Sequence, residues 1–202
     1  ALCENALCQE KGGLALSLQE LESNCQSCRA CPLWETRTHV VFGVGNPHAD
    51  ILFVGEGPGE QEDLTGEPFV GRAGQLLDLY LQAFDIARPE VYITNIVKCR
   101  PPRNRDPLPE EEAACIGYLE RQIELISPKI IVCLGRIAAM RLIKPDFRIT
   151  KEHGIWFERN GTPITATLHP AALLRDPRKK PDVFEDFKKI RAKCAELSGR
   201  GL

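Results

Sequence analysis

Two kinds of hydrophobic pattern alternate along the chain. Short, continuous apolar runs at residues 49–57, 91–99 and 128–135 predict buried strands, and the first of these ends in a glycine turn. Between them, apolar residues recur at helical spacing over 71–84 and 107–126, and the second of these segments has a proline and three glutamates near its start. This alternation is typical of a mostly parallel sheet with helices on both faces.

The C-terminal third completes this pattern with three further elements: a short helix over 136–143, a β-hairpin over 154–170 and a closing helix over 182–197. Asn160-Gly161 is the dipeptide typical of a two-residue hairpin turn, and the second hairpin strand leads directly into His169. We therefore predict a three-layer α/β/α fold around a central, mostly parallel sheet of four strands.

Ligands in such folds bind beyond the carboxyl ends of the strands, so the residues that follow each strand are the first candidates for a site. After the first strand, the turn "GEGPGEQED" exposes backbone N–H groups and does not match the phosphate-binding pattern G-x-G-x-x-G. It presents four carboxylates, on Glu56, Glu60, Glu62 and Asp63. An ordinary strand-to-helix turn is the more frequent explanation of such a segment.

Three other residues could contact a ligand. Phe69 lies in a loop, where it either fills the core or stacks on a planar base. Asn95 is a polar residue in an apolar strand, and its amide either caps a loop or reads an imide edge such as that of uracil. His169 lies where the last strand meets a loop, and it could donate a hydrogen bond to a ligand oxygen that gains negative charge.

The composition fits one globular domain, with 202 residues of which 43% are hydrophobic and 27% charged, and with no apolar run of about 20 residues. The first residues lack the basic and apolar regions of a signal peptide, so we expect a cytoplasmic protein. We predict a weakly structured extension over residues 1–22 and one domain over 23–198.

The net charge of −2 gives the protein as a whole no electrostatic attraction to nucleic acid. Two local basic clusters could still form a phosphate-binding stripe, although solvated surface loops are an equally frequent explanation of either cluster alone. The clusters consist of Lys98, Arg100, Arg103 and Arg105, and of Arg175, Arg178, Lys179 and Lys180.

Nine cysteines are many for a cytoplasmic protein, and in a reducing compartment clustered cysteines bind metal more often than they form disulfides. Cys25, Cys28 and Cys31 follow one another at three-residue intervals, and Cys99 and Cys115 provide further thiols. A C-x2-C pair with two distant cysteines fits structural zinc as well as a [4Fe–4S] cluster, and the spacing does not separate the two. The other four have no predicted ligand role: Cys3 and Cys8 are unassigned, and we expect Cys133 and Cys194 to be packing residues.

Taken together, these motifs resemble the family 4 uracil-DNA glycosylases, the iron–sulfur branch of the uracil-DNA glycosylase superfamily. The likeness extends from about residue 28 to about residue 191. The motifs that carry it are "CRACPLWETRTHVVFGVGNP", "GEGPGEQEDLTGEPFVGRAGQLL", "VYITNIVKCRPPRNR" and "HPAALLR". The resemblance implies a uracil-DNA glycosylase-like fold and an enzyme that flips uracil out of DNA and hydrolyses its glycosidic bond in base excision repair.

The resemblance also implies the residues of the site. A [4Fe–4S] cluster would be held by Cys28, Cys31, Cys99 and Cys115, which leaves Cys25 as a spare. Uracil would be bound by the backbone of Gly55, Glu56 and Gly57 and by the side chains of Phe69, Asn95 and His169. Glu56 would orient the attacking water, with Glu62 and Asp63 as competitors for that role, and His169 would stabilise the leaving uracil. Contacts to DNA would come from Arg100, Arg103, Arg105 and Arg175.

We expect a monomer that acts on uracil-containing DNA and does not bind membranes. Two alternatives belong to other classes of protein. One is a nucleic-acid-binding module without catalysis, whose cluster senses redox state or braces the fold. The other is a zinc protein, which would be colourless where an iron–sulfur protein is brown.

Overall fold

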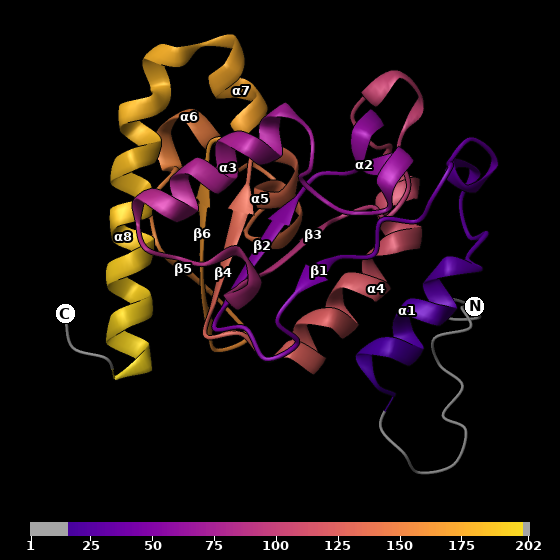
Figure 1. Cartoon of the computed structure of the whole chain (residues 1–202), viewed down its shortest axis with the longest axis horizontal. Helices are drawn as coiled ribbons and strands as arrows, with labels where there is room; N and C mark the ends of the chain where they lie inside the picture. The colour runs from indigo at the N-terminus through magenta and orange to yellow at the C-terminus, as the bar shows by residue number, and fades with distance from the viewer. Residues whose placement is uncertain (1–15, 200–202) are drawn as a thin grey trace.

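The computed structural model describes residues 16–199 (Figure 1). Most of the predicted extension, including Cys3 and Cys8, lies outside the described residues. Helix α1 (Leu18–Gln26) crosses the predicted boundary at residue 22, and its inner face is buried. The division of the chain into an extension and a domain stays a prediction.

A six-stranded sheet forms the centre of the molecule, with the strand order β1-β3-β2-β4-β6-β5. Its four inner strands run parallel, as predicted, and the sheet has two strands more than predicted, because a short antiparallel strand is added at each edge. In chain order the strands are β1 (Val44–Gly45), β2 (Ile51–Gly55), β3 (Tyr92–Asn95), β4 (Ile130–Leu134), β5 (Phe157–Arg159) and β6 (Thr162–Thr167).

Helices cover both faces of this sheet, and the predicted ones are present. After α1, the α-helices are α2 (Glu60–Thr65), α3 (Arg72–Ala83), α4 (Pro109–Ile126), α5 (Arg136–Leu142), α6 (Ile149–Glu152), α7 (Pro170–Arg175) and α8 (Lys180–Ser198). Short 3-10 turns are η2 (Pro32–Glu35), η3 (Arg88–Glu90), η4 (Pro102–Asn104) and η5 (Pro177–Lys179). None of the helices within residues 16–199 combines the length and apolar character needed to cross a bilayer.

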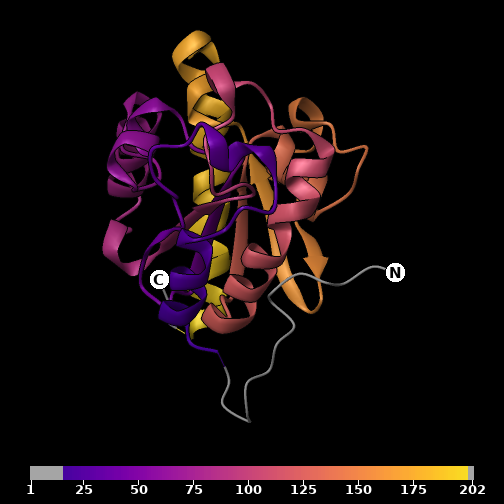
Figure 2. The same cartoon turned by 90° about the vertical axis from the view of Figure 1, so that its right-hand side faces the viewer.

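The alternation of side chains along β2 shows how the three layers are held together. Leu52 and Val54 pack into one hydrophobic cluster with residues of α1, α4 and α5. Ile51 and Phe53 point to the other face and pack with α3, α7 and α8. Figure 2 looks onto the α1 and α4 side, and Figure 1 shows α3 and α8 on the other. The predicted three-layer α/β/α architecture is therefore confirmed.

The C-terminal hairpin forms as predicted. Asn160 and Gly161 have φ angles of 49° and 82°, the left-handed values that a two-residue hairpin turn requires, and they join β5 to β6. Because β6 pairs in parallel with β4, the hairpin delivers the end of β6 to the same sheet edge as the ends of β2 and β3.

An aromatic cluster fixes α8 against the sheet. The buried ring of Phe187 lies 5.1 Å from that of Tyr80, 5.8 Å from that of Phe84 and 6.1 Å from that of Phe53. Phe184, one turn earlier, is 41% exposed and touches only the rim of this cluster, with its ring 4.8 Å from that of Phe84.

Replacing Phe187 by Ala should therefore destabilise the fold far more than replacing Phe184 by Ala. Deleting a buried phenylalanine side chain costs about 3–5 kcal/mol. In a protein of this size, about 1 kcal/mol shifts the unfolding midpoint by about 2–4 °C. We expect Phe187→Ala to lower the thermal unfolding midpoint by about 10 °C and Phe184→Ala by a few degrees at most. Equal shifts in the two variants would contradict this account of how α8 is anchored.

Candidate active site and metal centre

The carboxyl edge of the sheet gathers the residues that the sequence proposed as a ligand site. Gly55 ends β2, Asn95 ends β3, and the two residues are paired across the parallel strands. His169 follows β6 and caps α7, and its ring lies 5.6 Å from the ring of Phe69. Glu56 follows Gly55 directly, so the turn, the amide, the aromatic ring and the imidazole share one edge.

Asn95 carries an unusual buried atom. Its side chain is 1% exposed, and within residues 16–199 its Oδ1 is the one buried side-chain nitrogen or oxygen that lacks a hydrogen-bond partner. A buried acceptor without a partner costs about 1–3 kcal/mol. The pairing with Gly55 makes this arrangement possible, because a Cβ at position 55 would overlap both Asn95 Oδ1 and the ring of Phe69. The edge thus holds an acceptor that is suited to a donor from a ligand.

Phe69 is held in a strained conformation by its neighbours. Its φ angle of 54° lies in the left-handed region, which bulky residues seldom adopt. The carboxylate of Glu62 accepts hydrogen bonds from the next two N–H groups, those of Val70 (3.0 Å) and Gly71 (2.9 Å). The guanidinium of Arg88 donates to the carbonyl oxygen of Phe69 (3.2 Å) and to that of the preceding residue (2.7 Å). The ring position is therefore imposed from both sides of the loop.

The carboxylates that follow β2 differ in how they are used. Glu62 also accepts a hydrogen bond from the N–H of Gly59 (3.1 Å), so both of its oxygens hold backbone. Asp63 is buried, and its Oδ1 accepts from the N–H of Thr38 (2.9 Å). Among the hydrogen bonds of the described residues, none involves the carboxyl group of Glu56. The competitors of Glu56 for a water-orienting role are therefore occupied.

The environment of Glu56 favours its protonated form. Burial raises the pKa of Glu56 to about 7, and the neighbouring carboxylates of Asp106 and Glu112 act in the same direction. The guanidinium of Arg136 opposes them. A carboxyl group with this pKa exists in both forms near neutral pH.

The hydrogen bond of His169 determines which ring nitrogen carries the proton. Nδ1 accepts a hydrogen bond from the N–H of Ala171 (3.1 Å), so it is unprotonated and Nε2 carries the proton. Burial lowers the pKa of His169 to about 4, and Arg175 acts in the same direction, while Glu62 opposes them. The imidazole is therefore neutral at neutral pH and offers Nε2–H as a donor.

The predicted DNA-binding residues differ in whether a carboxylate of the protein holds their side chain by hydrogen bonds. Arg103 and Arg175 are exposed, and Arg100 donates to the amide oxygen of Asn104, Oδ1 (2.7 Å). Arg105 forms two hydrogen bonds of 2.8 and 2.7 Å with the buried carboxylate of Glu111, which neutralises most of its charge.

Lys98 does not belong to the basic surface, which corrects its place in the first basic cluster. Its side chain is 1% exposed. Burial lowers the pKa of Lys98 to about 8, and the thiols of Cys115, Cys25 and Cys99 act in the opposite direction.

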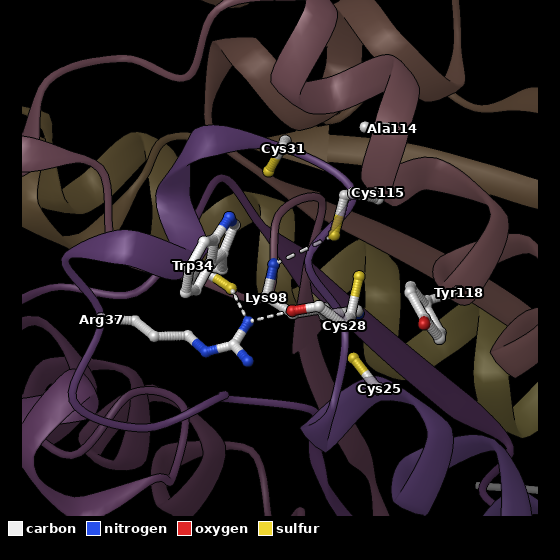
Figure 3. Close-up of a pocket in the computed structure, with 11 residues that line it drawn as sticks. Cys25, Cys28, Cys31, Trp34, Arg37, Lys98, Ala114, Cys115 and Tyr118 are labelled. Carbon is white, nitrogen blue, oxygen red and sulfur yellow. Dashed lines mark hydrogen bonds between the residues drawn. The ribbon is translucent and has the colours of Figure 1, made fainter. Parts of the chain in front are cut away.

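Five cysteines line one cavity on the α1 and α4 side of the sheet (Figure 3). They come from chain segments far apart in sequence. Cys25 ends the buried face of α1, Cys28 and Cys31 precede η2, Cys99 follows β3, and Cys115 lies in α4. The described part of the chain holds no group of three or more histidine, cysteine or acidic side chains arranged to bind a single metal ion. The thiols line the cavity together with Arg37, Lys98 and Tyr118.

Burial raises the pKa of the thiols of Cys25, Cys31, Cys99 and Cys115. Thiolates in such a place need a bound cation or a hydrogen-bond donor. Arg37 supplies such a donor, with its Nη1 3.2 Å from Cys99 Sγ. The other predicted thiols behave as packing residues, since Cys133 is buried in β4 and Cys194 packs against the core from α8.

Comparisons with known proteins show the family of the chain. The model of the uracil DNA glycosylase superfamily matches residues 42–192. The type-4 uracil-DNA glycosylase of Archaeoglobus fulgidus is 48% identical over 188 residues, which cover 89% of this chain and 94% of that protein. The type-4 enzyme of Thermotoga maritima is 46% identical, over 87% of this chain and 93% of its own. The chain belongs to the type-4 uracil-DNA glycosylases.

Family membership leaves open which side chains hold the site in shape, and sequence reasoning missed several of them. The clamp of Arg88 on the Phe69 loop and the donor role of Arg37 beside Cys99 were not predicted. Arg37 lies in the motif "CRACPLWETRTHVVFGVGNP" without a predicted role, and Arg88 lies in none of the quoted motifs, so both roles became visible only through contacts between distant segments.

Stability should depend on pH through His169. Its pKa is about 4 in the folded protein and 6.5 for the ordinary group, so between these values the unfolded chain binds a proton that the folded protein does not. Stability should therefore be fully present above pH 6.5 and fall as the pH drops toward 4. The total effect is on the order of 3 kcal/mol. Replacing His169 by Asn should flatten this part of the curve of unfolding midpoint against pH.

Asparagine suits this test because its Oδ1 can still accept a hydrogen bond from the N–H of Ala171 and cap α7. His48→Asn is the matched control, since His48 is exposed. Curves of wild type and His169→Asn that run parallel from pH 7 to pH 4 would contradict the neutral state of the half-buried His169.

Proposed function

We propose that this chain removes uracil from DNA by hydrolysing the bond between the base and its deoxyribose, which leaves an abasic site for base excision repair. The observation that carries the proposal is the buried, unpartnered Oδ1 of Asn95 beside Gly55. An acceptor in that position is matched by the N3–H of uracil. A binding module without catalysis would have no use for the neutral imidazole and the unengaged carboxyl group on the same edge.

Base recognition begins with extrusion of the nucleotide from the duplex, at a cost of a few kcal/mol that is smaller for a mismatched base. The uracil ring would stack on Phe69, whose position the loop already imposes. Asn95 Oδ1 would accept from N3–H, and its Nδ2 would donate to O4. Cytosine presents the opposite donor and acceptor pattern at these two positions, so it would leave buried polar groups unpaired.

Bond cleavage would use His169 and Glu56. As the glycosidic bond breaks, uracil leaves as an anion, and the Nε2–H of His169 would donate to its O2. The neutral state of His169 suits this role, because it offers a donor without needing a proton from solvent. Glu56, in its ionised form, would orient the attacking water and favour the positive charge that develops on the sugar.

DNA phosphates would be bound by Arg100, Arg103 and Arg175. Arg105 belongs to the predicted set as well. Its ion pair with Glu111 supports a role in holding the loop, and a strong phosphate contact is not proposed for it.

The cysteine cavity would hold a [4Fe–4S] cluster through Cys28, Cys31, Cys99 and Cys115. Four cysteines from three separate segments around one cavity are a donor set that such a cluster accepts. When bound, the cluster would act as a structural crosslink among the N-terminal segment, the loop after β3 and α4. We further propose that the protein is cytoplasmic, since nine cysteines suit a reducing compartment. We also propose that it is a monomer.

Release of uracil from an oligonucleotide with one uracil, detected as strand cleavage after alkali, tests the reaction. We expect release by the wild type and a loss of about 10²–10³ in rate for His169→Ala, because a pre-placed donor to the leaving group is removed. Asn95→Asp should weaken uracil recognition, since a carboxylate cannot donate to O4. His48→Ala, on the exposed surface, should behave as the wild type does. No release by folded, brown wild-type protein would refute the proposal and favour a binding module or another lesion.

Removal of a ligand cysteine tests the metal centre. Cys115→Ser should lose most of its iron and its brown colour, and DNA binding and thermal stability should fall before the chemical step is affected. Cys25→Ser is the matched control, because its thiol lines the same cavity outside the proposed ligand set. Full iron content in Cys115→Ser, or a colourless Cys25→Ser, would overturn the ligand assignment.

A further inference from the structure

Lys98 is the buried charge that the proposed reaction does not use. It lies in the loop after β3, and its side chain turns back beneath the end of that strand. Nζ donates hydrogen bonds to Thr94 Oγ1 (2.6 Å), to the carbonyl oxygen of Asn95 (2.8 Å) and to Gln122 Oε1 (2.6 Å). These three acceptors satisfy all the donors of an ammonium group.

None of these acceptors carries a negative charge, and within residues 16–199 Lys98 forms no ion pair with an aspartate or glutamate. A buried ammonium group without a counter-charge costs several kcal/mol. Lys98 instead lines the cavity that the five cysteines surround, and its backbone N–H lies 3.3 Å from Cys115 Sγ.

We propose that Lys98 is the internal counter-cation of the cysteine centre and the positioning residue that connects this centre to Asn95. The second part rests on the proposed function of Asn95 in reading uracil. Ligation converts thiols to thiolates, which gives Lys98 the negative partner that its surroundings otherwise lack. The same ammonium group holds the carbonyl oxygen of Asn95, whose side chain provides the unpartnered acceptor.

Arg37 provides the comparison that separates the two parts. Its guanidinium donates to Cys99 Sγ (3.2 Å) and to the carbonyl oxygen of Cys28 (2.9 Å), and the second of these bonds can be followed in Figure 3. Among the described residues, the hydrogen bonds of its side chain go to Cys28, Cys99 and Gln26, and none goes to Asn95. Both cations should therefore influence the charge of the centre, whereas Lys98 alone of the two should influence the uracil-reading amide.

The test compares Lys98→Met and Arg37→Met with wild-type protein in its iron-loaded form. Methionine keeps most of the volume of either side chain and removes the charge. The reduction potential of the cluster should shift to more negative values in both variants, because the reduced state is more negatively charged and loses a nearby cation. Affinity for free uracil should fall about tenfold in Lys98→Met and stay unchanged in Arg37→Met.

Two further variants keep the test decisive if Lys98→Met folds poorly. Gln122→Glu places a carboxylate on the same ammonium group and should also make the potential more negative. Thr94→Val removes one acceptor at nearly constant volume, and it should weaken uracil binding while leaving the potential unchanged.

An unchanged potential in Lys98→Met, or in Gln122→Glu if Lys98→Met does not fold, would overturn the counter-cation. Unchanged uracil affinity in Lys98→Met, or in Thr94→Val under the same condition, would overturn the link to Asn95. Either result, obtained while His169→Ala still loses uracil release, would refute this inference and leave the proposed glycosylase reaction in place.

Discussion

The parallel pairing of β2 with β3 is the constraint on which the candidate site depends, because it sets Gly55 opposite Asn95. The missing side chain at Gly55 allows the amide of Asn95 and the ring of Phe69 to close over the end of β2. A shift of this register by one residue would turn Asn95 to the other face of the sheet. The pairing of β2 with β3 therefore determines where the amide of Asn95 lies.

Burial changes the pKa values of Glu56 and His169 in opposite directions, because the ionised forms of the two groups carry opposite charge. It raises the pKa of Glu56 to about 7 and lowers that of His169 to about 4. One desolvated edge thus holds a neutral hydrogen-bond donor and a carboxyl group that ionises near neutral pH. That difference suits the two roles proposed for them, since one must stabilise a leaving anion and the other a developing cation.

Local patterns in the sequence were sufficient to predict the elements that need particular residue types, either for their backbone geometry or for complete burial. Asn160-Gly161 predicted the hairpin because two consecutive left-handed residues are needed there, and fully apolar runs predicted the parallel strands. The engagement of Glu62, which supports the preference for Glu56, could not be predicted, because it depends on hydrogen bonds to backbone eight and nine residues further along. The burial of Lys98 could not be recognised either. Its basic neighbours resemble a surface patch, and its burial depends on Gln122 in α4, which follows later in the chain.

The position of the cysteine centre follows from the connection between β3 and α4. Residues 96–108 form a long loop whose only regular element is the short turn η4, and such loops are seldom rigid on their own. Cys99 lies near the start of this loop and Cys115 one and a half turns into the helix that follows it, so a cluster bound to both would hold the loop from each side. The ion pair of Arg105 with the buried carboxylate of Glu111 fixes the segment between them. Such a centre would thereby keep Arg100 and Arg103 at a constant distance from the edge that carries Asn95 and His169.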